Sequence, residues 1–363
     1  MGEVATGQEL TEVEVVVHPA MVGMGCHYRD AMQSYTVIGL GAIGGYYGAR
    51  LQQAGADVRF VVRRDRDRLA ARGLRVDSPE GDLLVDLEVY DDPADVPASD
   101  VIVVATKTTA TPTVVPVVAQ LAAGRGSDVT VMVMQNGLGV EAPFADAAPD
   151  AAVVGAMCFM CSNLVAPGHI VHLDYGAVTL GQHRPDPGGP DAHRSGSGGP
   201  RPAAVVGADL GAAGVAASQV DDLVTGRWQK LVWNIPFNGL SVLLDAGTDQ
   251  MLADPAVRAR ARHLMDEVVT AAAACGSGFD PAFAQMMMDH TEAMIPYKTS
   301  MKLDYEAGRP LELDAIYGAP TAAARAAGAP MTDTEELLAD LRQLESVPLI
   351  DRSPGGTSRA TSS

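Results

Sequence analysis

Lys230, Asn234 and Asn238 are polar residues spaced four apart inside an otherwise apolar stretch, 228–240. Residues with this spacing share one helix face, so an ammonium and two amides would form a polar ridge. Burying such groups without partners costs roughly 1–3 kcal/mol each, so something polar should lie opposite them. We predict that this ridge faces a substrate. A solvated helix face is the alternative.

Lysine is scarce in this chain. Only four of the 26 basic residues are lysines, namely Lys107, Lys230, Lys298 and Lys302. A lysine ammonium can release its proton and shifts its pKa readily on burial, which a guanidinium does not. Lys230 could therefore stabilise negative charge that develops on a carbonyl oxygen and donate a proton to it. We expect partial burial to lower its pKa from about 10.4 toward neutrality.

A glycine-rich turn follows the strand-like residues 35–38 and precedes a helical stretch, 45–53. Its first glycine permits a tight turn, its second lets the backbone approach a pyrophosphate, and its third allows close helix–strand packing. The N-terminus of the following helix attracts the phosphate charge. We predict a dinucleotide site here. The expected binding residues are Gly39, Leu40, Gly41, Ala42, Ile43 and Gly44.

The end of the second strand-like run, 57–62, indicates which dinucleotide binds. An NAD site usually has Asp or Glu there to hold the ribose hydroxyls, whereas a 2′-phosphate calls for arginine. This chain has Arg63 and Arg64. We therefore predict NADPH as the cofactor, with Arg63 as a binding residue. Asp65 keeps NADH open as an alternative, and an ordinary basic loop is another.

Two further polar positions follow strand-like runs. Lys107 comes after residues 101–105, and Asn136 comes after residues 129–134. Ligands collect at the carboxyl ends of strands in open α/β sheets, so both positions are candidates for binding. The Asn-Gly pair at 136–137 is also typical of a simple turn.

Short apolar runs alternate with helical stretches up to about residue 220, and long helical segments follow. The pattern predicts an α/β fold, in which a Rossmann-type doubly wound parallel sheet precedes a mostly α-helical domain. We expect the cofactor domain to cover residues 34–220 and the helical substrate domain 221–346. Residues 1–33 and 347–363 are expected to be poorly ordered ends, and the Pro/Gly/Ser-rich residues 184–202 a flexible insertion.

The composition restricts the class of protein. The 363 residues are 47% hydrophobic and 20% charged, which is ordinary for a globular protein. The net charge of −19 argues against nucleic acid and anionic membrane as partners. No apolar run reaches the roughly 18–20 residues that span a membrane, and the acidic N-terminus is unlike a signal peptide. Four cysteines give no disulfide framework, so we expect a cytoplasmic location.

No metal site is predicted. Cys158 and Cys161 have the spacing of a redox or metal pair, but they lie in a strand-like run without a second pair nearby. We interpret them as buried structural cysteines. His263 and Glu267 share a helix face, which we interpret as a solvated contact.

Five motifs in sequence order resemble the ketopantoate reductases (2-dehydropantoate 2-reductases), NADPH enzymes of pantothenate and coenzyme A synthesis. The resemblance covers about residues 34–346. The matching residues are 39–45, Lys107, 135–137, 228–231 with Asn234 and Asn238, and 300–301 with 308–314.

This resemblance implies reduction of a 2-oxo acid to the 2-hydroxy acid, with ketopantoate as the first candidate substrate and NADPH as the cofactor. It implies that Lys230 is the general acid and that Glu312 orients the substrate. Many members of the family are dimers, so we expect a homodimer formed through the helical domain. The residues implied to line the substrate site are Asn136, Asn234, Asn238 and Ser300, and those near the cofactor are Arg63 and Lys107.

The chain departs from the family pattern in three places. Residues 311–318 read Leu-Glu-Leu-Asp-Ala-Ile-Tyr-Gly where the family commonly has Thr-Glu-Ile-Asp-x-Ile-Asn-Gly. Ala110 stands where a glutamine is frequent, and residues 184–202 are additional. Reduction of another 2-oxo acid, a ketone or an imine therefore stays open. A non-catalytic NADPH-sensing module is the alternative from a different class of protein. For Glu312, the alternative to a substrate role is a carboxylate that stabilises the N-terminus of the helical segment 313–328.

Overall fold

The computed structural model describes residues 32–184 and 201–347. Residues 1–31 of the predicted N-terminal extension, residues 185–200 of the predicted insertion and residues 348–363 of the predicted tail lie outside the described residues.

The glycine-rich turn joins a strand to a helix, as predicted. Strand β1 (Tyr35–Ile38) leads into helix α1 (Ala42–Gln53), and β2 (Val58–Val61) returns parallel to β1. Strand β6 (Val101–Val104) pairs parallel with β1, and β7 (Thr130–Val133) pairs parallel with β6. The four apolar runs of the sequence are therefore neighbouring parallel strands, whose carboxyl ends lie at one edge of the sheet.

Further strands extend this sheet to the order β4-β3-β9-β8-β7-β6-β1-β2-β5, and β10 pairs with β9. Strands β8 and β9 form a long antiparallel hairpin, and β3 and β4 also pair antiparallel, so the sheet is mostly but not wholly parallel. The added strands are β3 (Leu74–Asp77), β4 (Leu83–Val85), β5 (Glu88–Tyr90), β8 (Ala152–Ala166), β9 (His169–Gln182) and β10 (Ala217–Val220).

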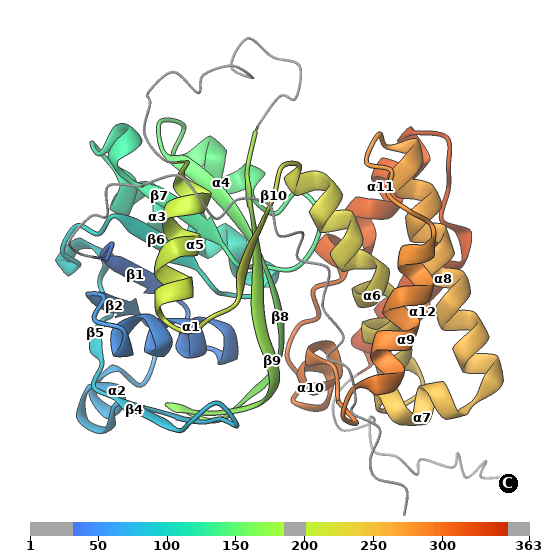
Figure 1. The fold of residues 1–363 in the computed structure, drawn as a ribbon, viewed down its shortest axis with the longest axis horizontal. Helices are drawn as coiled ribbons and strands as arrows, with labels where there is room; N and C mark the ends of the chain where they lie inside the picture. The colour runs from blue at the N-terminus through green and yellow to red at the C-terminus, as the bar shows by residue number, and fades with distance from the viewer. Residues whose placement is uncertain (1–31, 185–200, 348–363) are drawn as a thin grey trace, which may run out of the picture. The chain divides into compact units, whose positions relative to one another are not determined.

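Helices cover both faces of the sheet because alternate strand residues point to opposite sides. In β1, Val37 packs into the core under α1 and α5 (Pro202–Ala212), and Ile38 packs into the core under α3 (Thr111–Ala122). Figure 1 shows α1 and α5 over the same face. The shorter helices are α2 (Arg66–Arg72), α4 (Ala142–Ala147) and three 3₁₀ turns, η1 (Pro93–Asp95), η2 (Thr108–Ala110) and η3 (Gly126–Asp128).

The C-terminal part is built around α6 (Leu223–Leu243), which is buried along most of its length. Its apolar side chains form one core with those of the neighbouring helices. Among the described residues, no helix combines the length and the hydropathy that a membrane crossing requires. The other helices are α7 (Thr248–Ala253), α8 (Pro255–Ala274), α9 (Ala282–Ala293), α10 (Ser300–Glu306), a π-helical turn (Asp314–Gly318), α11 (Ala319–Ala326) and α12 (Thr332–Ser346).

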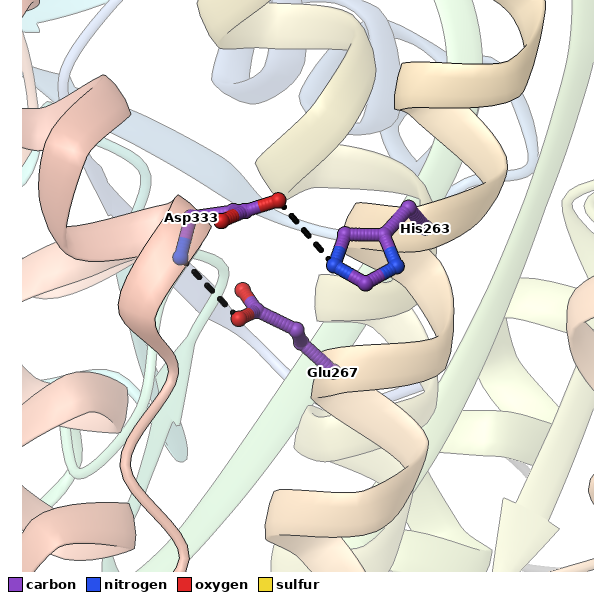
Figure 2. A group of neighbouring side chains, drawn as sticks. All are labelled: His263, Glu267 and Asp333. Carbon is purple, nitrogen blue, oxygen red and sulfur yellow. Dashed lines mark hydrogen bonds and ion pairs between the residues drawn. The ribbon is translucent and has the colours of Figure 1, made fainter.

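A side chain of α8 holds the N-terminus of α12 (Figure 2). Glu267 accepts hydrogen bonds from the backbone nitrogens of Asp333 and Thr334, at 3.0 and 2.9 Å. His263 Nε2 lies 3.0 Å from the Asp333 carboxylate. His263 and Glu267 were expected to form a solvated contact within α8, but both instead bind residues of α12. Because N–H groups at the start of α12 donate to the Glu267 carboxylate, Glu267 caps α12. The positive end of the α12 dipole disfavours a bound cation at this position.

Candidate active site

The glycine-rich turn has the backbone geometry that a pyrophosphate site requires. Gly39 has φ +107°, which favours glycine, and a Cβ on Gly44 would lie 2.1 Å from the Gly39 carbonyl oxygen. By contrast, a Cβ on Gly41 would meet nothing within 4 Å, so space is open in front of the first turn of α1. That turn contains no acidic residue. The residues present therefore fit an anionic dinucleotide.

A basic cavity follows the end of β2. Its volume is about 340 Å³. Arg66 is partly fixed, because its Nε lies 3.4 Å from the Val89 carbonyl oxygen and 3.6 Å from the Asp91 carboxylate, whereas Arg63 is exposed. Four guanidinium groups against three carboxylates give the cavity a positive balance that suits a phosphate. The lining residues are Arg63, Arg64, Asp65, Arg66, Asp67, Arg68 and Asp91.

Lys230 is a partly buried ammonium on α6. Its Nζ donates a hydrogen bond of 2.7 Å to the Cys158 carbonyl oxygen of β8 and lies 3.9 Å from the centre of the Phe159 ring. Desolvation by burial lowers the pKa of Lys230 to about 8, and the charge of Arg227 acts in the same direction. The expected lowering is therefore present. At neutral pH the ammonium is protonated, and it can release its proton more easily than a solvated lysine.

The two asparagines of the ridge are buried one and two turns beyond Lys230. Asn234 Nδ2 lies 3.5 Å from Asn136 Oδ1, in the loop after β7. Asn238 is only 2% exposed, and its Oδ1 has no hydrogen-bond partner in the described part of the chain. An orphaned buried amide oxygen is costly and is a place where a ligand hydroxyl can donate. The solvated-face alternative is therefore wrong.

The loop that carries Asn136 requires glycine at position 137. It has φ +118°, and a Cβ there would lie 2.6 Å from the Ala315 carbonyl oxygen. The next residue, Leu138, donates its backbone N–H to that same oxygen at 3.0 Å. The Asn-Gly pair is thus a turn that packs against the π-helical segment, and it fixes the backbone next to Asn136.

Glu312 and Lys107 lie together although they are far apart in the sequence. Glu312 Oε1 accepts hydrogen bonds from Thr108 N and Oγ1, and Oε2 lies 3.3 Å from Lys107 Nζ. The same ammonium lies 2.9 Å from Asp304 Oδ2. Burial of the ammonium opposes its charge, but the attraction of both carboxylates outweighs burial and raises the pKa of Lys107. The Glu312 side chain thus bonds to the η2 turn, and among the described residues it makes no hydrogen bond to the N–H groups of the helical segment that follows it.

Ser300 is the first residue of α10 and is partly exposed. Within the described residues, no hydrogen bond or ion pair joins it to Lys230. Three polar residues that were not predicted from the sequence contact the predicted residues or the backbone beside them. They are Asp304, which pairs with Lys107, and Arg227 with its ion-pair partner Glu141, next to Asn136. The sequence position of Arg227 could have marked it as a site residue, because it precedes Lys230 by three residues in the same apolar helix. The partners of these residues lie on distant segments, which no local pattern marks.

Two family models match the chain. Ketopantoate reductase PanE/ApbA matches residues 35–185, and Ketopantoate reductase PanE/ApbA C terminal matches residues 222–345. A 2-dehydropantoate 2-reductase of Nostoc sp. is 42% identical over 318 residues, which cover 86% of this chain and 95% of that relative. A 2-dehydropantoate 2-reductase of Mesorhizobium japonicum is 28% identical over 85% of this chain and 97% of the relative.

Solved structures agree with the sequence relatives. The crystal structure of 2-dehydropantoate 2-reductase from Geobacter metallireducens has a TM-score of 0.78 and 35% identity, and the match covers 85% of this chain and 99% of that one. A D-mandelate dehydrogenase in complex with NADH and anilino(oxo)acetate has a TM-score of 0.72 at 20% identity, over 86% and 98%, which shows likeness of fold alone. The family models, the relatives and the fold all lead to one assignment: the chain belongs to the ketopantoate reductase family.

Proposed function

We propose that the protein reduces 2-dehydropantoate (ketopantoate) to pantoate with NADPH. The observation that carries this proposal is Lys230, a partly buried ammonium whose pKa is lowered to about 8, one turn before an asparagine that reaches the Asn136 loop. A 42% identical relative is named 2-dehydropantoate 2-reductase, which supports the choice of substrate.

When bound, NADPH would supply a hydride to the 2-oxo carbon of the substrate. The glycine-rich turn, 39–44, holds the pyrophosphate through backbone N–H groups and the N-terminus of α1. Arg63 binds the 2′-phosphate, which the basic cavity after β2 supports. Lys107 and Asn136 follow neighbouring parallel strands at the edge where ligands of such sheets bind, so we assign them to the cofactor as well.

The remaining residues handle the proton and the orientation of the substrate. Lys230 stabilises the charge that forms on the 2-oxo oxygen and donates its proton there, so that hydride and proton together give the hydroxyl. Glu312 accepts a hydrogen bond from a substrate hydroxyl, and Ser300 helps to hold the substrate carboxylate. Asn234 and Asn238 line the same site, and the orphaned Oδ1 of Asn238 supports this role.

The wider organisation is also part of the proposal. We assign residues 34–220 to cofactor binding and 221–346 to substrate binding and dimerisation, with 1–33, 184–202 and 347–363 outside these functions. A related ketopantoate reductase from Staphylococcus aureus is described as dimeric, and its fold is similar at 21% identity. We therefore propose a homodimer. Its proposed cytoplasmic location is consistent with free cysteines at positions 158, 161 and 275.

The test follows NADPH absorbance with the purified full chain and a panel of 2-oxo acids, ketones and imines. Ketopantoate should give the highest kcat/KM, and NADPH should be preferred over NADH. Faster reduction of another compound would assign the protein to a paralogous reductase. Tight NADPH binding without turnover of any compound would leave the NADPH-sensing module and reject the enzyme.

A further inference from the structure

Arg227 and Glu141 form a fully buried ion pair between α6 and the loop before α4. Each is only 2% exposed. Arg227 donates to Glu141 Oε1 from Nε, at 2.8 Å, and from Nη2. Removing two charges from water is costly, and apolar residues of similar size would often stabilise a fold as well. The pair therefore needs an explanation other than stability.

The same guanidinium also holds the end of β7. Its Nη1 donates to the Gln135 carbonyl oxygen at 2.5 Å, and its Nη2 lies 3.3 Å from the Val133 carbonyl oxygen. One planar group thus joins three separate acceptors. The carbonyl of Gln135 belongs to the peptide bond that leads directly into Asn136. Arg227 consequently fixes the backbone from which the Asn136 side chain projects.

The position of Arg227 on its own helix completes the connection. It precedes Lys230 by three residues and Asn234 by seven, which places all three within two turns of α6. We propose that Arg227 and Glu141 are positioning residues, which hold Lys230 and Asn234 of α6 in register with the Asn136 loop. This inference rests on the proposed function, because it concerns the proton donor of that reaction.

The first experiment replaces both charges at once, because a single substitution would strand a buried charge. Arg227→Met/Glu141→Leu is compared with Arg258→Met/Glu292→Leu as the matched control. Arg258 also donates from Nε and Nη2 to one carboxylate oxygen of its partner, but that pair is 44% and 43% exposed. Ketopantoate turnover, NADPH affinity by titration calorimetry and thermal unfolding are measured for both variants and for the wild type.

We expect the buried-pair variant to unfold near the wild-type temperature and its kcat to fall at least tenfold. Its NADPH affinity should fall clearly less than its kcat, because Asn136 is only one of the residues assigned to the cofactor. The alkaline limb of its pH profile should move to higher pH, because a positive charge near Lys230 is gone. The control should match the wild type in every measurement. Wild-type kcat in the folded buried-pair variant overturns the inference. A loss of NADPH affinity as large as the loss of kcat also overturns it, since the defect is then general.

If the double variant does not fold, Arg227→Lys tests whether Arg227 is a positioning residue. Lysine keeps the charge near Glu141 but cannot reach three acceptors from one planar group. A folded Arg227→Lys protein with at least a tenfold lower kcat supports positioning, and one with wild-type kcat, or one that fails to fold, overturns it. A wild type that reduces no compound of the panel rejects the proposed function itself, whereas an active wild type with unaffected variants rejects only this inference.

Discussion

Glu312 is anchored to Thr108, although 204 residues separate them. One carboxylate oxygen accepts both the backbone N–H, at 2.8 Å, and the hydroxyl, at 3.0 Å, while the other faces Lys107 at 3.3 Å. The carboxylate is 5% exposed and cannot rotate without losing these bonds. Thr108 therefore occupies Oε1, and Oε2, which faces the Lys107 ammonium, is the Glu312 oxygen left for a further hydrogen bond.

Glu312→Ala should weaken ketopantoate binding more than it slows turnover. The substitution removes the acceptor that we propose for the substrate hydroxyl and leaves Lys107 with Asp304 as its remaining carboxylate partner. We expect KM for ketopantoate to rise at least about tenfold, the scale of losing a charged hydrogen bond of 1.5–3 kcal/mol. Steady-state kinetics measure this change, with Glu306→Ala on α10 as control. An unaltered KM would contradict the assignment of Glu312 to the substrate.

Lys230→Ala should abolish most of the chemistry and little of the cofactor binding. The ammonium bonds to the Cys158 carbonyl oxygen of β8, whereas the proposed pyrophosphate site is the separate glycine-rich turn between β1 and α1. Loss of a positioned acid usually costs about a hundredfold or more in rate. We therefore expect kcat to fall at least about a hundredfold while the Kd of NADPH stays within about twofold. Lys298→Ala, an exposed lysine paired with Glu306, is the control.

Reduction should slow as the pH rises through about 8. Burial lowers the pKa of Lys230 to about 8, and only its protonated form can donate a proton. Activity is therefore full below that pKa and falls about tenfold per pH unit above it. The pH dependence of kcat/KM reports the free enzyme and measures this pKa. A limb that appears only near 10.5, the ordinary lysine value, would show that the ammonium is solvated during the reaction.

Local parts of this architecture follow from the sequence, and contacts between distant segments do not. The strand, turn and helix around residues 35–53 are encoded by adjacent apolar runs and glycines, and the i, i+4 ridge that begins at Lys230 requires only helix geometry. The partner of Arg227 lies 86 residues earlier, and that of Glu312 lies 204 residues earlier. Such pairs depend on how the sheet and the C-terminal segments meet, which hydrophobic periodicity does not specify.

Strand β9 illustrates the same limit. Its residues alternate in burial, but its antiparallel pairing with β8 is interrupted by three register irregularities, and β3 pairs parallel to its other edge. The parallel run β2, β1, β6, β7 is marked by continuous apolar residues because both faces are covered. The β8–β9 hairpin leaves Leu164 and Val165 exposed, so its apolar residues do not show which of them are buried.

Arg63→Ala should change the choice of cofactor. Arg63 is exposed and lines the basic cavity, and a 2′-phosphate would gain a charged hydrogen bond from it. We expect KM for NADPH to rise at least about tenfold and KM for NADH to change less than twofold. Arg72→Ala, at the far end of α2, is the control. An equal rise in both KM values would mean that Arg63 does not read the 2′-phosphate.

Glu267→Ala should destabilise the protein without altering catalysis. The variant leaves the backbone nitrogens of Asp333 and Thr334 without their acceptor and removes a carboxylate from the positive end of α12. Losing a helix cap costs about 0.5–2 kcal/mol, so the free energy of unfolding in urea should fall by about that amount.

Two comparisons separate this cap from a metal site. Glu336 is an exposed glutamate on α12. Glu336→Ala should change the free energy of unfolding by less than about 0.5 kcal/mol. Addition of Zn²⁺ should leave the unfolding of the wild type unchanged, because the helix N–H groups repel a cation from the oxygens that they bind. If Zn²⁺ raised the unfolding temperature of the wild type but not that of Glu267→Ala, the three side chains in Figure 2 would be metal ligands and the capping explanation would be wrong.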